Sequence, residues 1–179
     1  GGYANMESFL LAIDPARAFP GREGWATDAV RMVPFNIQDW AAIGQTEVLF
    51  YRDSTLSGRI SLPATTTFAF ECAGALQVID PSGLAYRAAP GDKGFSGPTE
   101  VLGWPRGVQR SAGDRLFWHT GDGVPVLLLN GHFYLLRLLR QGRVPMLEPL
   151  PIQAPTSGHV TDALWNERLQ MLIVATDIE

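Results

Sequence analysis

Three histidines and one cysteine are the residues of this chain best suited to metal binding or nucleophilic catalysis: His119, His132, His159 and Cys72. A metal site needs several such ligands within about 2 Å of one ion, and a thiolate nucleophile needs a neighbouring base. The chain has no His-x-His or His-x-x-x-His pair. Cys72 lies in the apolar segment 68–74, FAFECAG, which indicates a strand running into a turn. We therefore expect Cys72 to be a small buried residue.

Other catalytic motifs are missing as well. Gly94-Phe95-Ser96-Gly97 does not have the Gly-x-Ser-x-Gly spacing of a nucleophile elbow, and no glycine-rich phosphate loop is present. The sequence accordingly predicts no catalytic residue, no metal site and no cofactor. A non-enzymatic protein is favoured.

Turn signals recur at short intervals along the chain, as short antiparallel strands require. They lie at Asp53 to Gly58, Asp80 to Gly83, Pro90 to Asp92, Trp104 to Gly107, Gly121 to Gly123 and Asn130-Gly131. Runs of β-branched and aromatic residues lie between them and predict strands over residues 47–51, 66–70 and 76–79, with a returning strand over 172–176.

The stretch 127–136, LLLNGHFYLL, predicts a hairpin rather than a helix. A glycine inside a helix costs about 1 kcal/mol, whereas Asn-Gly between apolar runs tolerates the positive φ angles of a two-residue turn. With the turn near Gly121-Asp122, the prediction is a meander of strands at roughly 114–119, 124–129 and 132–138. Its register pairs Leu129 with His132 and Val126 with both Leu135 and Phe117.

Both faces of this meander are apolar, so each face needs a cover. One face carries Leu116, Trp118, Leu127, Leu129, Tyr134 and Leu136. The other carries Phe117, Val124, Val126, Leu128, Phe133 and Leu135. A second sheet of the same chain is expected over one face. The other is expected to be covered by residues 1–45 or by another protein molecule.

The same register separates the histidines of the meander. His119 and His132 fall on opposite faces, roughly 16 Å apart along the strands. A cupin-like barrel, in which histidines and carboxylates share one metal, is therefore the least favoured reading. Gly113-Asp114 before a strand is the only other feature in its support.

Helical patterns are confined to two places. Asn36 and Gly44 resemble the cap residues of a short helix, and Leu164, Trp165 and Leu169 lie near helical spacing within 161–171. The predicted fold class is mainly β, an antiparallel β-sandwich or jelly-roll-like barrel with one or two short helices. No internal repeat is evident, so we expect a single domain over 1–179: a covering segment with a short helix (1–45), a strand core (46–150), and a helix with a return strand (151–179).

Composition limits the range of partners. The net charge of −4 offers no general attraction to nucleic acid. No uninterrupted apolar run reaches the ~18 residues of a membrane-spanning helix, and a single cysteine excludes an intrachain disulfide. A soluble protein is expected, and its compartment is not indicated.

Two functions from different classes fit this pattern. The first is a self-associating structural protein, such as a virion coat or shell component, with other copies or other protein subunits as partners. Its expected interface comprises Phe117, Val126, Leu128, Phe133, Leu135 and Arg137. The charges at Arg137, Arg140 and Arg143 have a second interpretation, in which they protect the end of an apolar strand against edge pairing.

The alternative is a recognition module for a carbohydrate or another small molecule. Trp25, Trp104 and Arg106 lie in turn-rich segments where an aromatic ring could stack on a sugar. Large aromatic residues in such loops also commonly fold back to close the end of a sandwich.

Overall fold

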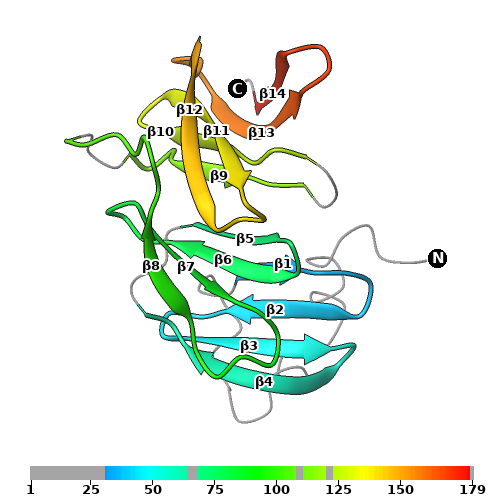
Figure 1. Cartoon of the computed structure of the whole chain (residues 1–179). Coiled ribbons are helices and arrows are strands. Elements are labelled where there is room, and N and C mark those ends of the chain that lie inside the picture. The colour runs from blue at the N-terminus through cyan, green and yellow to red at the C-terminus, as the bar shows by residue number, and fades with distance from the viewer. Residues whose placement is uncertain (1–30, 64–67, 108–110, 120–122, 178–179) are drawn as a thin grey trace. The chain divides into compact units, whose positions relative to one another are not determined.

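The computed structural model describes residues 31–63, 68–107, 111–119 and 123–177, and these residues form antiparallel β-sheets (Figure 1). The predicted mainly β class is confirmed. The described part of the chain contains no helix, and hence no helix long and apolar enough to cross a membrane. The arrangement of the sheets as a sandwich or jelly roll stays a prediction.

Three sheets have four strands each, and a fourth sheet has two. The first is β1 (Arg31–Pro34), β2 (Asp39–Ile43), β3 (Glu47–Arg52) and β4 (Thr55–Ser61). The second is β5 (Phe68–Cys72), β6 (Ala75–Ile79), β7 (Leu84–Ala88) and β8 (Ser96–Glu100). The third is β9 (Arg115–Phe117), β10 (Val126–Leu129), β11 (His132–Leu139) and β12 (Val144–Gln153). The last is the hairpin of β13 (His159–Asn166) and β14 (Met171–Asp177).

Every sheet runs in sequence order, so each strand lies beside its neighbours along the chain. The same four-strand arrangement thus recurs along the chain without a repeated motif that the sequence made evident. A repeated arrangement of strands needs buried positions and turns at suitable intervals. Different residues can meet these needs in each copy, so the sequences of the copies need not be similar.

Two compact units divide the chain. One comprises the described residues up to Asp80 together with Tyr86–Gly97, and the other comprises Pro81–Ala85 and the described residues from Pro98 onward. One boundary falls between β6 and β7, and the other two fall within β7 and within β8. The expectation of a single domain stays a prediction.

The first predicted helix, over 36–44, is wrong. Asn36 is not a helix cap: its Oδ1 accepts hydrogen bonds from the amides of Gln38 (2.7 Å) and Asp39 (2.8 Å) and closes a turn. The chain then continues as β2, which pairs along its length with β3. Short polar side chains stabilise turns and helix starts by the same bond, so the cap signal was ambiguous.

The second predicted helix, over 161–171, is also wrong. Residues on either side of a turn at 167–170 form β13 and β14, with Leu164 paired with Ile173 and Trp165 with Leu172. Asn166 Oδ1 accepts a hydrogen bond from the amide of Leu169 (2.9 Å), and Gln170 has a φ of 52°. Strand pairing therefore overrides a weak helical spacing in this segment.

The predicted meander is confirmed. Leu129 pairs with His132, and Val126 pairs with Leu135 on one side and with Phe117 on the other, as the register required. Asn130 and Gly131 have φ angles of 48° and 81°, which suit the two-residue turn. The predicted strands at 47–51 and 76–79 are also present, as β3 and β6.

The sheet of β1 to β4 in the first unit has a buried apolar core. In this sheet Trp40 of β2 stacks on Tyr51 of β3, with ring centroids 4.3 Å apart. The Trp40 indole N–H donates to the carbonyl oxygen of Asp53 at 2.7 Å, which satisfies the polar atom of an otherwise buried ring.

Candidate functional site

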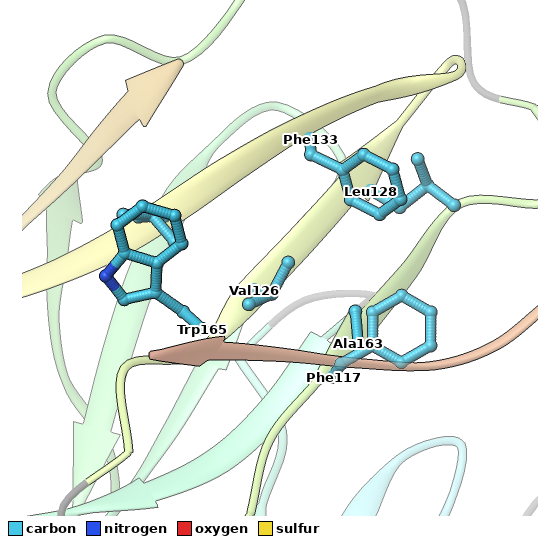
Figure 2. Close-up of a cluster of buried hydrophobic side chains, with 7 residues drawn as sticks. Phe117, Val126, Leu128, Phe133, Ala163 and Trp165 are labelled. Carbon is cyan, nitrogen blue, oxygen red and sulfur yellow. The ribbon is translucent and has the colours of Figure 1, made fainter. Parts of the chain in front are cut away.

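One face of the meander is covered by the chain's own C-terminal hairpin. Ala163 and Trp165 of β13 lie over this face and complete a buried cluster (Figure 2). The meander contributes Phe117, Val126, Leu128, Phe133 and Leu135. These are the apolar residues expected from the sequence to form an intermolecular interface.

The opposite face of the meander is buried too. Leu127, Leu129 and Leu136 are at most 3% exposed. Neither face of β10 is therefore open in this structure.

Arg137, the remaining predicted interface residue, ties the hairpin to the meander. From β11, its Nε lies 2.8 Å from Glu148 of β12 and its Nη1 lies 2.9 Å from Glu167 in the β13–β14 turn. Glu167 also accepts a hydrogen bond from the indole N–H of Trp165. The guanidinium contacts two carboxylates, and one of these also accepts a hydrogen bond from the Trp165 ring. Such a network fixes the position of the turn better than an isolated surface ion pair does.

The charges of this network are mutually stabilised. The Arg137 guanidinium, followed by the Trp165 indole, lowers the pKa of the Glu167 carboxyl below its ordinary value. In return, the hydrogen bond to Glu167 raises the pKa of Arg137. The Glu167 carboxyl is therefore ionised to lower pH than that of an isolated glutamate.

His119 forms a second link to the hairpin. Its Nε2 lies 3.0 Å from Oδ1 of Asp162 on β13. Both side chains are partly exposed, and no group of three or more His, Cys, Asp or Glu side chains that could hold a metal is found among the described residues. His119 thus has a carboxylate partner from another strand that sequence reasoning did not find.

The outer face of the hairpin is apolar and exposed. Leu164 of β13 is 42% exposed, and its cross-strand partner Ile173 is 55% exposed. Met171 lies two residues from Ile173 on the same face and is 55% exposed, and Leu169 in the turn is 54% exposed. Alternate residues of β14 point inward, where Leu172 and Val174 pack on the buried cluster.

This outer face is the best candidate for a functional site in the described chain. It presents clustered large side chains on a hairpin whose position is fixed by Trp165 and the Arg137 network. Such a surface can bind apolar side chains of another molecule. Sequence reasoning missed it because a helix over 161–171 places Leu164 and Trp165 on different surfaces from those of a strand.

The residues proposed for carbohydrate stacking are not brought together. Trp104 is half-buried, and its ring lies over Gly83 so closely that an added Cβ would meet ring atom Cδ2 at 2.6 Å. Arg106 is exposed and pairs with Glu100 at 3.3 Å. Trp25 lies outside the described residues. One face of the Trp104 ring is therefore occupied by the chain itself.

Cys72 is half-buried at the end of β5. Burial, followed by the neighbouring Glu71 carboxylate, raises the pKa of its thiol. A raised pKa lowers the fraction of thiolate at neutral pH, which agrees with the structural role expected for this cysteine.

Comparison with known proteins finds matches among solved structures and not among family models or curated proteins. No protein-family model matches the chain, and no curated protein does so. Two of the similar solved structures are the crystal structures of BBS1N in complex with ARL6DN soaked with mercury and with lead. Their sequence identities to this chain are 15% and 16%, both with a TM-score of 0.45, covering 82% and 83% of this chain. The chain spans 47% and 46% of those two chains, less than half of either.

Proposed function

We propose that this protein is a non-enzymatic protein-interaction module that binds another polypeptide through the outer face of the β13–β14 hairpin. The observation that carries the proposal is the exposure of Leu164, Met171 and Ile173 side by side on a fixed hairpin. Contiguous exposed apolar side chains on an ordered surface mark interaction sites more often than isolated ones do.

The interface expected from the sequence is relocated by this proposal. Self-association through the meander would require Leu128 and Phe133 to be accessible, whereas they are 5% and 1% exposed and lie under β13. The hairpin that covers them presents its own apolar surface. The surface that would contact a partner is therefore the outer face of the hairpin and not the meander face that the hairpin covers.

The finer alternatives have less support. Nothing in the described residues points to a virion shell in particular. Carbohydrate recognition has less support because one face of the Trp104 ring packs on Gly83. We therefore retain a protein partner as the class of ligand, with copies of the same chain as one possible identity.

Site-specific photo-crosslinking tests the proposal. A photoreactive phenylalanine analogue at position 173 should give discrete protein adducts in cells that make the protein, because this side chain lies in the proposed interface. The same analogue at position 37 is the matched control, since Ile37 is 97% exposed but lies in a turn of the other unit. Adducts no more abundant from position 173 than from position 37 would refute the proposed function.

A further inference from the structure

The turn between β11 and β12, residues 140–143, has an unusual backbone for its sequence. Arg140, Gln141 and Gly142 have φ angles of 51°, 58° and 84°. Among the described residues, Arg140 and Gln141 are the only two adjacent non-glycine residues with positive φ. Arginine and glutamine are unfavourable in this conformation, whereas asparagine, which precedes the glycine of the β10–β11 turn, adopts it readily. The requirements of the turn therefore do not explain why Arg140 and Gln141 stand there.

Arg140 and Arg143 lie opposite each other at this turn. The Arg143 amide donates to the carbonyl oxygen of Arg140 at 3.3 Å, and strand pairing continues from Leu139 and Val144. Like charges that lie opposite each other on paired strands destabilise the pairing. Both arginines are exposed, and neither has an ion-pairing or hydrogen-bonding side-chain partner within the described part of the chain. Two guanidinium groups are thus held at one turn without a carboxylate to neutralise them.

Other arginines of the chain do have such carboxylates. Arg137 on β11 pairs with Glu148 and Glu167. Exposed arginines elsewhere form the pairs Arg52–Asp39, Arg59–Glu47 and Arg106–Glu100. The chain carries more acidic than basic residues, yet the β11–β12 turn has two arginines and no acidic residue. The positive charge of this turn is therefore a local exception in an acidic protein.

Protection against edge pairing does not account for these charges. β11 lies between β10 and β12, so both of its edges are already paired. β12 contains Pro145, Pro149 and Pro151, which have no amide hydrogen to donate to a further strand. The strands are thus protected without Arg140 and Arg143.

We propose that Arg140 and Arg143 bind an acidic segment of a protein partner, with a carboxylate of that segment between the two guanidinium groups. The planar guanidinium group donates two parallel hydrogen bonds to a carboxylate, which makes arginine well suited to this role. A carboxylate at this position would also replace the repulsion between the two arginines with attraction. The inference goes beyond the proposed function, because it concerns a second surface that is defined by charge and does not depend on the outer face of the hairpin.

The surroundings of the turn favour a polypeptide over a phosphate group. Leu139, directly before the turn, is 46% exposed and offers an apolar contact beside the two charges. An apolar side chain next to an acidic residue can use this contact, whereas a phosphate cannot. The net charge of −4 also opposes binding of a nucleic acid backbone. The expected partner segment therefore combines carboxylates with at least one apolar side chain.

NMR titration of the purified full chain tests the inference, with the synthetic peptide Glu-Asp-Leu-Ile-Asp-Glu as the probe. We expect the peptide to shift the Nε–Hε resonances of Arg140 and Arg143 and the methyl resonances of Leu139. Arg140→Gln and Arg143→Gln should each weaken binding about fivefold, because each removes one charge-assisted contact at a partly screened surface. Arg52→Gln is the matched control and should bind as the native chain does, since Arg52 is an exposed arginine of the other unit.

The amide analogue Gln-Asn-Leu-Ile-Asn-Gln separates charge from apolar contact, and it should leave the arginine resonances unchanged. Equal binding of both peptides would overturn the inference, as would unchanged resonances at millimolar acidic peptide or equal binding by the two arginine variants and the native chain. Inorganic phosphate or a thymidine oligonucleotide that shifts the same resonances at lower concentration than the acidic peptide would also overturn it, and would identify a phosphate site instead. None of these outcomes affects crosslinking from position 173, so the proposed function is tested separately.

Discussion

Arg137 joins the β13–β14 turn to the meander through ion pairs. It pairs with Glu148 on its own sheet and with Glu167 across to the turn, and its side chain is 22% exposed. The Arg137 side chain therefore links the sheet to the turn and does not form a free basic cluster with Arg140 and Arg143. The sequence could show the charge but not its partners, which lie 11 and 30 residues away.

Replacing Arg137 with methionine should lower the free energy of unfolding by about 1 kcal/mol, because the apolar length is kept while both partly exposed ion pairs are lost. Arg143→Met is the matched control, since Arg143 is exposed at the neighbouring turn. Urea unfolding measures both variants. Equal urea midpoints for Arg137→Met and Arg143→Met would show that the two ion pairs of Arg137 contribute nothing to stability.

The pKa of Glu167 gives the turn a defined pH dependence. Since its folded-state pKa is lowered, its contribution to stability is complete above the unfolded-state value and is lost as the pH falls through the lowered folded-state value. The Trp165 indole N–H resonance, followed by NMR, should therefore shift at a pH below the ordinary glutamate range. In Arg137→Met the midpoint should move upward, and an unmoved midpoint would contradict the assigned cause.

At the scale of elements, Gly131 and Gly158 allow conformational strain to be separated from steric overlap. Their φ angles are 81° and 80°, so alanine is strained equally at both. An added Cβ meets nothing within 4 Å at Gly131, whereas at Gly158 it would overlap the carbonyl oxygen of Asp177. The two positions thus differ only in the space around them.

Gly131→Ala should cost roughly 1 kcal/mol of stability, the penalty of the left-handed conformation alone. Gly158→Ala should cost more, because the start of β13 must move away from the end of β14. Urea midpoints compare the two variants. A smaller loss for Gly158→Ala would mean that these strand ends separate without cost.

The two sides of β10 give a further prediction for this element. Leu127→Asp and Leu128→Asp should both prevent folding of the second unit, since each buries an unpaired charge at a side chain that is at most 5% exposed. Leu164→Asp, on the outer face of the hairpin, is the control and should stay folded by circular dichroism. A folded Leu128→Asp variant would show that β13 does not cover the meander.

The elements that the sequence predicted well are those governed by local chemistry. Asn130-Gly131 determines a turn type, and the turn determines the register, so the pairs of β10 with its neighbours followed directly. The helix predicted over 161–171 was wrong because Leu164, Trp165 and Leu169 satisfy both a helical spacing and a strand–turn pattern. The choice between them depends on the apolar cluster that Trp165 enters, which lies far away in sequence.

At the scale of the whole molecule, three of the described sheets have four strands each and one has two. The candidate site follows from the exposure of neighbouring apolar side chains on the β13–β14 hairpin rather than from any motif, which is why sequence alone did not locate it. Exposed leucine and isoleucine residues become informative only when strand pairing shows that they lie side by side on one face. The functional claim therefore concerns what covers β14 when the protein is at work.

Oxidation of Met171 tests that claim most directly. Met171 lies on the outer face and is 55% exposed, whereas Met32 of β1 is partly buried in the other unit and provides an internal reference. After brief treatment with hydrogen peroxide, mass spectrometry gives the ratio of sulfoxide at the two positions. The ratio of Met171 to Met32 should be high in the isolated chain and fall several-fold in an extract of the cells that make the protein, as a bound polypeptide shields β14. An equally high ratio in both samples would contradict the account.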